Sequence, residues 1–519
     1  MKRTAGRLCV ACSVLASCAI IASCSEAERA SEGSPNEPLA TAARGGSSAG
    51  ASAGGVSGAG TSGGSVGSGG STGVAGTAGE MPPAGGSSGV AADSGAARCG
   101  SDLPRVQSFD TERAARGQTL FESGTLTPGI LPEVILRNLW VAWAVAPPAT
   151  DDEFWQQAAA RYGLTRVAGE NGGLPLGMGR DASGLVGFNC LLCHAGTIDG
   201  TAIIGAANYR VDLESLFDDL LLMRDLAPAL GLPLLPVPFE LDGFTHAAGA
   251  QDAFGLGFRL AGAAPSFGPQ RAPAWWQLHY KERAFADGSG DARSHRSMMA
   301  TLVAFGVTPD QLMAREEDFI DVFHYLLSLE PPCFSHRPLD AARVARGVTV
   351  FDAHCASCHG VHSGDAASYP NQVVPLGMVG TDPVRAERFT SVEAGGLNAS
   401  WFGDPPFEAT GGYLAPPLAG VWARAPFFHN GSVPTLAAVL DPSLRPAVWR
   451  RVEVDGSDYD PEHIGLRYEV VASAPDPSTR EGRLVYDTSR EGMGNEGHDF
   501  GAALSQDERT DLLEYLLSL

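Results

Sequence analysis

Apolar residues recur at helical spacing in two segments of the C-terminal half, residues 341–354 and 508–519. Residues three or four positions apart lie on one face of a helix, so each segment predicts an amphipathic helix with a buried stripe. The stripe positions are Val344, Val348 and Phe351 in the first segment and Leu512, Tyr515, Leu516 and Leu519 in the second.

Both predicted helices contain phrases that occur a second time in the chain. ARGQTLF at 115–121 resembles ARGVTVF at 345–351, and YLLSL stands at 325–329 and again at 515–519. The same opening and closing phrases therefore frame two segments, which indicates an internal duplication.

The length of 519 residues suits two or three domains. Pro331 and Pro332 would stop the helix that closes the first copy. We therefore predict a mostly α fold with long loops, in which two related domains occupy residues 99–333 and 334–519.

The N-terminal residues 1–24 are typical of an export signal. Three basic residues precede an apolar run at 8–22 that is too short to span a membrane. The run ends in IASC, a bacterial lipoprotein processing pattern, so we predict lipidation of Cys24, with Cys18 as the alternative. An ordinary cleaved signal is the competing interpretation. Either predicts an exported protein of the cell envelope, and lipidation predicts an anchor in the periplasm or on the outer membrane.

A low-complexity segment follows the signal. Residues 45–79 contain only Gly, Ser, Ala, Thr and Val, a composition that cannot bury enough apolar surface to offset its ordering entropy. We predict a disordered, flexible linker over 25–98. The formal net charge of −23 argues against nucleic acid as a partner, because that ligand rewards clustered Lys and Arg.

Four cysteines stand in two C-x-x-C-H motifs, the attachment signature of c-type haem. On one helical turn the two thiols can form thioethers with the haem vinyl groups, and the adjacent imidazole reaches the iron. We therefore predict two covalently bound haem c groups, one in each of two cytochrome c-type domains. The motif residues are Cys190, Cys193 and His194 in the first copy and Cys355, Cys358 and His359 in the second.

Other uses of paired cysteines fit the sequence less well. A redox dithiol is typical of a βαβ setting, which the pattern does not show, and a structural zinc needs two nearby ligand pairs. Cys99 and Cys333 remain outside the motifs. They either form a disulfide across the first domain or stay as two buried thiols.

Residues 415–431, APPLAGVWARAPFFHNG, follow the second motif and resemble the bacterial di-haem cytochrome c peroxidase superfamily. That superfamily includes the di-haem enzyme that matures a tryptophan-derived quinone and the latex-cleaving rubber oxygenases. The peroxidases usually place a Met ligand shortly after this phrase, but 437–442 contains none. PAWWQLHYK at 273–281 and GHDF at 497–500 are similar to the rubber-oxygenase branch.

The resemblance implies an iron ligand for the second haem near the C-terminus. We predict His498 as its distal ligand and keep His429 as the alternative. For either histidine the competing interpretation is a side chain held at a turn beside the haem.

The first haem is predicted to have an open or weakly ligated face. Peroxidases of this superfamily often carry a displaceable His shortly after the first motif, but 195–210 contains neither His nor Met. His194 would then be the proximal ligand of the catalytic haem. The alternative is ligation by one of four more distant residues. These are His246, His279, Met178 and Met223.

Two further groups of side chains have competing interpretations. Trp275 and Trp276 would line the distal pocket of the first haem, connect the two haems as an electron relay, or simply pack in the core. The acidic residues are expected on a solvated helix face with no catalytic role. They are Asp212, Glu214, Asp218 and Asp219.

The resemblance implies a haem-dependent oxidoreductase. Peroxide or dioxygen would react at the first haem, while the second haem relays electrons from a redox partner protein. In the peroxidase version the oxidant is peroxide, and in the oxygenase version dioxygen attacks an apolar alkene. A non-catalytic di-haem electron-transfer cytochrome is the alternative.

Overall fold

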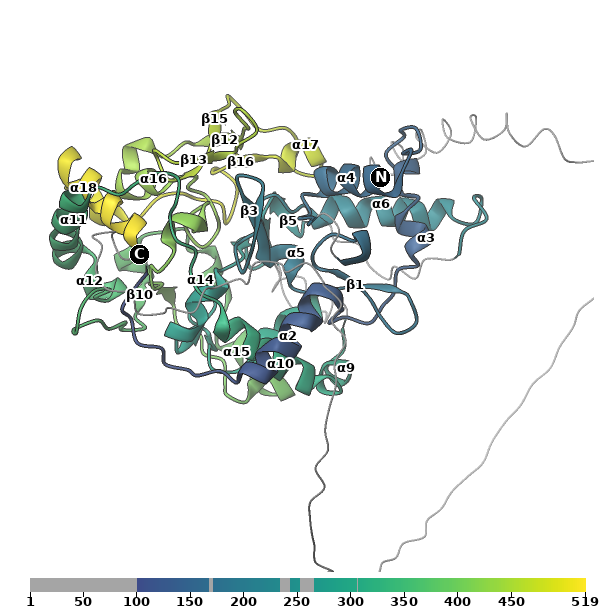
Figure 1. The fold of residues 1–519 in the computed structure, drawn as a ribbon, viewed down its shortest axis with the longest axis horizontal. Coiled ribbons are helices and arrows are strands. Elements are labelled where there is room, and N and C mark those ends of the chain that lie inside the picture. The colour runs from purple at the N-terminus through teal and green to yellow at the C-terminus, as the bar shows by residue number, and fades with distance from the viewer. Residues whose placement is uncertain (1–99, 168–170, 234–242, 253–265, 306) are drawn as a thin grey trace, which may run out of the picture. The chain divides into compact units, whose positions relative to one another are not determined.

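A computed structural model describes residues 100–519 apart from 168–170, 234–242, 253–265 and 306 (Figure 1). The predicted signal at 1–24 with both candidate lipidation sites, the predicted linker at 25–98 and Cys99 lie outside the described residues. Within the described part, no helix is both long and apolar enough to cross a membrane.

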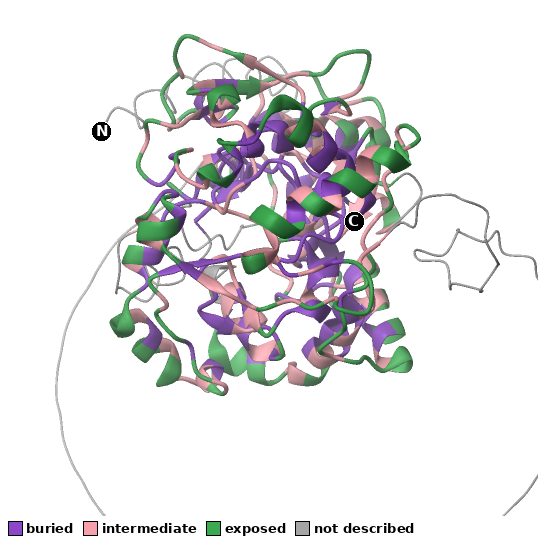
Figure 2. Ribbon diagram, turned by 90° about the vertical axis from the view of Figure 1, so that its left-hand side faces the viewer, coloured by how far each residue is buried: buried purple, intermediate pink, exposed green. Residues whose placement is uncertain are grey.

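Two helix pairs repeat one packing arrangement. α2 (Thr111–Ser123) lies against α10 (Glu316–Ser328), and α11 (Ala341–His354) lies against α18 (Gln506–Ser518). The two amphipathic helices expected from the apolar stripes are therefore confirmed. Figure 2, which views the chain from the side of α11 and α18, shows helices with exposed outer faces over a buried interior.

The repeated ARG phrase has the same physical role in both copies. A Cβ atom on Gly117 would lie only 2.2 Å from the backbone oxygen of Asp321, and one on Gly347 would lie 2.1 Å from that of Asp511. Only glycine allows the helices to approach this closely. The arginine before each glycine binds the side chain of the same aspartate, at 2.7 Å in the first copy and 2.6 Å in the second.

The remaining α-helices are short, apart from α4 and α6. They are α3 (Glu133–Leu136), α4 (Asp151–Tyr162), α5 (Leu191–His194), α6 (Leu213–Leu226), α8 (His295–Met299), α9 (Pro309–Met313), α12 (Ala356–His359), α13 (Leu376–Val379), α14 (Val384–Arg388), α15 (Ser391–Asn398), α16 (Leu436–Leu440) and α17 (Arg480–Arg483). Turns of 3-10 helix lie at Leu139–Val141, Asn171–Gly173, Trp275–Tyr280, Ala300–Phe305, Trp401–Gly403, Val421–Arg424, Pro442–Leu444 and Asp499–Gly501.

Short antiparallel strands occupy the segments between the helices. They are β1 (Met178–Arg180), β2 (Val186–Phe188), β3 (Ala195–Ile198), β4 (Thr201–Ile204), β5 (Thr245–Ala247), β6 (Ala250–Gln251), β7 (Gln270–Arg271), β8 (Arg283–Ala284), β9 (Gly290–Asp291), β10 (Val373–Pro375), β11 (Gly412–Leu414), β12 (Val448–Arg451), β13 (Tyr459–Asp460), β14 (Gly465–Leu466), β15 (Tyr468–Val470) and β16 (Val485–Asp487). Among the described residues they form two-stranded pairs and the three-stranded sheets β15-β12-β16 and β5-β6-β7. Helices predominate, and the strand pairs are an addition to the predicted mostly α fold.

One apolar core joins residues from both predicted domains. Trp276 and Tyr209 from the first pack in it with Phe351, Trp422 and Trp449 from the second. Trp276 has no exposed surface, and its indole nitrogen donates a hydrogen bond to the backbone oxygen of Ala419 at 3.0 Å. The segments 99–333 and 334–519 therefore meet in a shared core.

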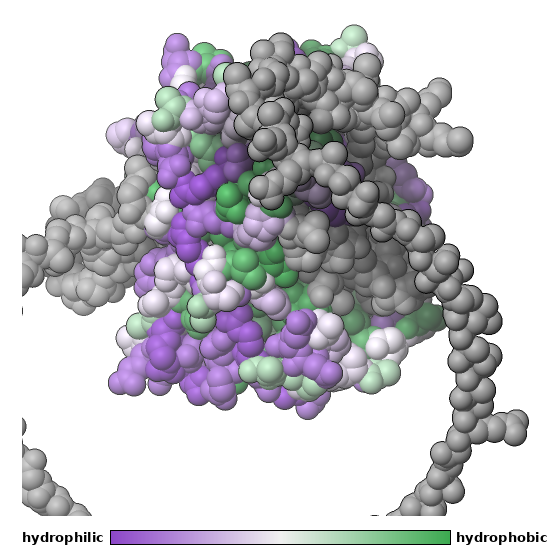
Figure 3. Space-filling view, turned by 90° about the vertical axis from the view of Figure 1, so that its right-hand side faces the viewer, coloured by the Kyte–Doolittle hydropathy of each residue, from purple (hydrophilic) through white to green (hydrophobic). Residues whose placement is uncertain are grey.

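Hydrophilic side chains are concentrated on one part of the described surface. Viewed from the right-hand side of Figure 1, hydrophilic side chains gather along the lower edge of the described surface (Figure 3).

Cys333 is disulfide-bonded, whereas the four cysteines of the C-x-x-C-H motifs are free thiols. The disulfide alternative for Cys333 is therefore supported, although Cys99 lies outside the described residues.

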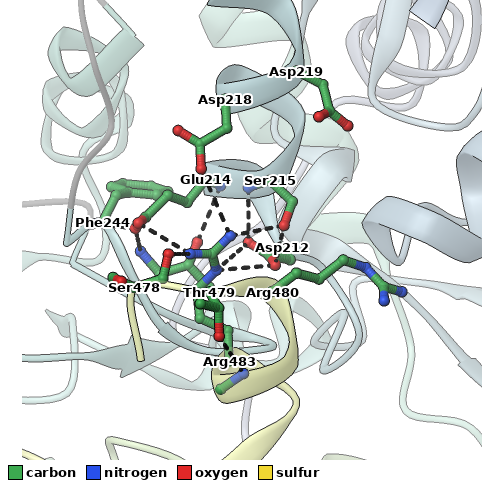
Figure 4. Close-up of polar contacts among 12 residues, drawn as sticks. Asp212, Glu214, Ser215, Asp218, Asp219, Phe244, Ser478, Thr479, Arg480 and Arg483 are labelled. Carbon is green, nitrogen blue, oxygen red and sulfur yellow. Dashed lines mark hydrogen bonds and ion pairs between the residues drawn. The ribbon is translucent and has the colours of Figure 1, made fainter. Parts of the chain in front are cut away.

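A buried ion network fastens α17 to the start of α6 (Figure 4). The Nε of Arg483 lies 3.0 Å from both carboxylate oxygens of Asp212, and its Nη1 lies 3.1 Å from Glu214 Oε1. The arginine also donates from Nη2 to Ser215 Oγ at 2.8 Å. The charged side chains are 2–3% exposed, and removing one partner of such a buried pair typically costs about 3–5 kcal/mol.

The prediction that four acidic residues of α6 lie on a solvated face is wrong for three of them. The four acidic residues concerned are Asp212, Glu214, Asp218 and Asp219. Asp219 accepts hydrogen bonds from Arg161 Nε and the Tyr162 hydroxyl, each at 2.7 Å, while Asp218 keeps 28% of its side chain exposed. Arginines from other segments cover this side of the helix, so its acids serve as their buried counter-charges.

Glu214 gives this network a pH dependence. Burial raises the pKa of Glu214 to about 7, whereas an unfolded glutamate titrates near about 4.3. Because the folded chain holds this proton more tightly, the stabilising contribution is complete below the unfolded pKa and is lost as the pH rises to about 7.

We expect Glu214→Gln, which keeps an acceptor for the amides of Phe244 and Thr245, to remove this dependence. Between pH of about 4.5 and 7.5, the wild type should lose up to about 3 kcal/mol of unfolding free energy relative to the variant. Thermal unfolding followed by circular dichroism at both pH values tests this. Parallel stability curves for the two proteins would contradict it.

Candidate haem sites

The two C-x-x-C-H motifs fold in the same way. Cys190 immediately precedes α5 and Cys355 immediately precedes α12. In each motif the histidine amide donates to the backbone oxygen of the first cysteine, at 3.0 Å, so one turn of chain carries both thiols and the imidazole. This is the arrangement that attachment of a c-type haem requires.

Each motif histidine is oriented by a proline carbonyl from a distant segment. His194 Nδ1 lies 3.1 Å from the backbone oxygen of Pro273, and His359 Nδ1 lies 2.8 Å from that of Pro416. A carbonyl oxygen only accepts, so Nδ1 carries the proton and Nε2 keeps its lone pair for a metal. Burial lowers the pKa of His194 to about 3 and also lowers the pKa of His359, which keeps both rings neutral.

A cavity of about 1660 Å³, including solvent at its mouth, lies beside the second motif. Cys355, Cys358 and His359 line it, and most of its other walls are aliphatic or aromatic side chains. The wall residues include Phe351, Val374, Leu418, Val421, Phe427 and Leu440.

His498 faces His359 across this cavity. The centres of the two imidazole rings are 6.1 Å apart and their planes are inclined by 60°. Two imidazoles bound to one metal ion from opposite sides, with bonds of about 2.0–2.1 Å, would place their centres roughly 6.3 Å apart. Burial lowers the pKa of His498 to about 4, and its buried Nδ1 has no hydrogen-bond partner among the described residues.

His429, the alternative ligand, lines the same cavity in a different setting. Its ring stacks on that of Tyr413, with centres 4.0 Å apart and planes inclined by 19°. Burial lowers the pKa of His429 to about 3. Among the described residues, the imidazole ring that lies across from His359 is that of His498. The geometry therefore favours His498, the first of the two predicted ligands.

Three cations face the cavity without a carboxylate partner among the described residues. Arg271, Lys281 and Arg424 all line it, and the last two are less than 9% exposed. Burial lowers the pKa of all three, to about 7 for Lys281 and about 10 for Arg424. Uncompensated buried cations are costly, so the cavity is suited to an anionic ligand. The two propionate groups of a haem supply that charge, so the residues present fit this cofactor.

The surroundings of His194 are aromatic and apolar. Its ring stacks on Trp275 with centres 4.1 Å apart, and Trp275 stacks in turn on Phe121 at 5.3 Å. Cys190 packs against the same core cluster as Trp275. Other aromatic members of that cluster are Phe267, Phe319, Tyr325, Phe389, Phe402 and Phe407, and Phe285 and Trp401 pack against it.

The four residues predicted as alternative ligands of the first haem lie on elements other than α5, which carries the first motif. Met178 lies on β1 and Met223 on α6, both buried in the core. His279 is buried beside Tyr280, and His246 lies on β5, where its backbone oxygen accepts from Arg490.

The segment 271–276 contacts both motifs. The Pro273 carbonyl binds His194, Trp275 stacks on the same ring, and Arg271 and Pro273 also line the cavity beside His359. The two tryptophans are buried, as core packing predicts, and they also lie in this segment.

Sequence reasoning missed the three cations and the two proline carbonyls. Arg424 and Pro416 stand inside the phrase 415–431, and Lys281 ends the phrase 273–281. Both phrases were recognised by resemblance alone. A basic side chain in a largely apolar phrase was the available signal, because such a residue needs a buried counter-charge.

Comparison with known proteins finds a matching family and related sequences. Residues 412–450 match the family described as RoxA-like, cytochrome c-like. Two uncharacterized proteins of Sinorhizobium fredii, y4iM and y4iJ, are 27% identical over 289 residues and 33% identical over 149 residues. These matches cover 47% and 27% of this chain, which spans 63% and 22% of the lengths of the two relatives.

A solved structure, that of a MauG-like protein associated with microbial copper homeostasis, is 17% identical with a TM-score of 0.23. The similarity covers 80% of this chain and 92% of the other.

The two motifs and the family match at 412–450 indicate a c-type cytochrome that binds haem. The resemblance predicted from the phrase at 415–431 agrees with this match, since residues 412–450 are similar to the RoxA-like, cytochrome c-like family.

The number of haems can be tested by removing one motif at a time. We expect the double variants Cys190→Ala/Cys193→Ala and Cys355→Ala/Cys358→Ala each to lose one of two haems, because thioether bonds hold the cofactor. Intact mass and the pyridine haemochrome spectrum measure this. Ser357→Ala, which alters an exposed residue inside the second motif, is the control and should keep both haems. A wild-type protein with one haem would contradict the prediction.

Proposed function

We propose that this chain is an exported di-haem oxidoreductase that activates peroxide or dioxygen beside His194 and relays electrons through a second haem beside His359. The family match at 412–450 supports the more general part of this proposal, a c-type cytochrome of the oxidoreductase kind. The observation that carries the proposal is the unequal surroundings of the two histidines. The imidazole ring of His498 lies across from that of His359. Among the described residues, the ring of His194 instead stacks on the indole of Trp275.

In the second site, Cys355 and Cys358 would hold the haem covalently, with His359 and His498 as its axial ligands. The separation of 6.1 Å between the two rings supports this assignment. The cations that line the cavity would balance the propionates.

In the first site, Cys190, Cys193 and His194 would hold the haem. A bound haem supplies an iron that exchanges electrons and, where one axial position is open, binds and activates peroxide or dioxygen. Burial keeps His194 neutral, while its bond to the Pro273 carbonyl orients the ring and increases the donor strength of Nε2. Trp275, which stacks on the His194 ring, would give the site an apolar wall that suits an apolar substrate.

Trp275 and Trp276 would serve as positioning and relay residues rather than as acid–base groups. Trp275 lies against His194, and Trp276 bonds to Ala419, three residues from the Pro416 carbonyl that orients His359. This continuous packed route supports electron transfer between the two sites.

The predicted signal and linker complete the proposal. Lipidation at Cys24 would anchor the protein in the periplasm or on the outer membrane, and the glycine-rich segment 25–98 would leave the haem-binding part free to turn. Electrons would come from a redox partner protein.

Turnover assays distinguish the two chemical versions and the electron-carrier alternative. Peroxide-dependent oxidation of a reduced cytochrome would favour the peroxidase version, and oxygen uptake with a polyisoprenoid would favour the oxygenase version. In Trp275→Phe either rate should fall at least about tenfold, a barrier change of about 1.4 kcal/mol, while the haem spectra stay unchanged. Wild-type protein with both haems and neither activity would contradict the proposed catalysis.

The assignment of His498 can be tested with a cavity variant. His498→Gly should convert one haem from low spin to high spin, and added imidazole should restore the low-spin signal, because it can enter the vacated position. Electron paramagnetic resonance measures both states. His429→Ala is the matched control and should leave the spin state unchanged, whereas the opposite pattern would identify His429 as the ligand.

A further inference from the structure

A second cavity, of about 1400 Å³ including solvent at its mouth, has a lining different from that of the cavity beside His359. Its walls come from β5 and β6 in the first half of the chain and from β12 and β16 in the second, near α17 (Figure 1). Pro426 and Gly431 line it, whereas residues 427–429 between them line the cavity beside His359. One loop therefore contributes to both cavities.

One wall of this second cavity is aromatic. Side chains alternate along a strand, so Trp449 and Arg451 lie on the same face of β12. Trp449 lies opposite Tyr486 on β16, and the two rings stack with centres 5.3 Å apart and planes inclined by 12°. Their polar atoms are satisfied elsewhere, since the indole nitrogen donates to the Ser432 backbone oxygen at 3.2 Å and the hydroxyl to that of Asn430 at 3.0 Å.

Arg451 lines the same cavity with an incompletely paired guanidinium. Among the described residues its one ion pair is with Asp458, whose Oδ2 lies 3.4 Å from its Nε, too far for a strong hydrogen bond. That carboxylate is 1% exposed and already accepts hydrogen bonds from the Tyr209 hydroxyl at 3.0 Å and from Arg210 Nη2 at 2.5 Å. Burial lowers the pKa of Arg451, as does the neighbouring charge of Arg210. A bound anion would offset this cost.

The other charged side chains of the lining are compensated or exposed. Arg483 is held by the carboxylates at the start of α6. Arg450 is exposed and binds a carboxylate on β15, while Glu453 and Glu481 are exposed to solvent. Arg451 is thus the cation of this lining that an anion would satisfy best.

We propose that this second cavity is a binding site for a small organic carboxylate with a flat apolar body. The carboxylate would bind the guanidinium of Arg451, whose planar fork matches two carboxylate oxygens, and the body would lie against the wall formed by Trp449 and Tyr486. Apolar walls with a few polar groups are typical of cavities that hold small molecules. The site goes beyond the proposed haem chemistry and does not depend on it.

Benzoate is a simple probe of this chemistry. Calorimetric titration of the oxidised holoprotein should give a Kd of about 1 mM or lower for benzoate. Benzyl alcohol and inorganic phosphate should bind at least about tenfold more weakly, because the first lacks the charge and the second lacks the apolar body. No benzoate binding, or equal affinity for either comparison compound, would overturn the proposed site.

Arg451→Lys keeps a positive charge beside Asp458 but removes the planar fork, so the Kd for benzoate should rise at least about fivefold. Arg293→Lys is the matched control, since it makes the same change at an exposed arginine that binds Asp291 at 2.9 Å. Its Kd should equal that of the wild type. An unchanged Kd in Arg451→Lys, or an equal rise in the control, would contradict the assignment.

A second pair of variants tests the cavity at a position that tolerates polar side chains. Leu484 lines the cavity and is 40% exposed. Leu484→Asp adds a negative charge to the lining, whereas Leu484→Asn adds a neutral side chain of the same shape. The aspartate variant should bind benzoate more weakly than the asparagine variant, and the two should bind benzyl alcohol equally. Equal benzoate affinities would count against the site.

Cyanide separates this site from the proposed haem chemistry, because it occupies an open haem iron. The Kd for benzoate should be the same with and without saturating cyanide. A Kd that rises with cyanide would place the probe at an iron and overturn the second-cavity site. A protein that binds benzoate through Arg451 but has no turnover would overturn the proposed catalysis and leave this site in place.

Discussion

The hydrogen bond from each motif histidine to a distant proline carbonyl is the constraint on which both candidate haem sites depend. A C-x-x-C-H turn fixes where the imidazole stands but not which way its ring faces. The carbonyls of Pro273 and Pro416 fix that orientation and the tautomer, leaving Nε2 to each metal. Pro273 also lines the cavity beside His359, so the segment that orients His194 forms part of the wall of the second site.

The parts of the fold that the sequence could predict are those set by local patterns. Apolar stripes predicted α11 and α18, and the repeated phrases predicted two copies of one helix pair. The structure adds the reason for that repetition, since Gly117 and Gly347 allow a close helix contact. The motif turns were also predictable, because thioether chemistry fixes their spacing.

Contacts between distant segments could not be read from local patterns. The acids at the start of α6 have the spacing of a solvated face, yet Arg483 covers Asp212 and Glu214 from a segment more than 250 residues away. The three cations beside His359 likewise acquire their meaning only when three separate segments meet around one cavity. For the iron ligands, sequence supplied the candidates, and the ring contact between His498 and His359 supports the proposal of His498 over His429.

The central claim is the asymmetry between the two irons, with His498 opposite His359 and an open position opposite His194. Quantitative electron paramagnetic resonance of the oxidised protein as isolated tests it most directly. The account predicts one haem with a high-spin or weakly ligated ferric signal and one six-coordinate, low-spin haem with two histidine ligands. Two fully low-spin, six-coordinate haems would contradict it and leave a protein suited to electron transfer alone.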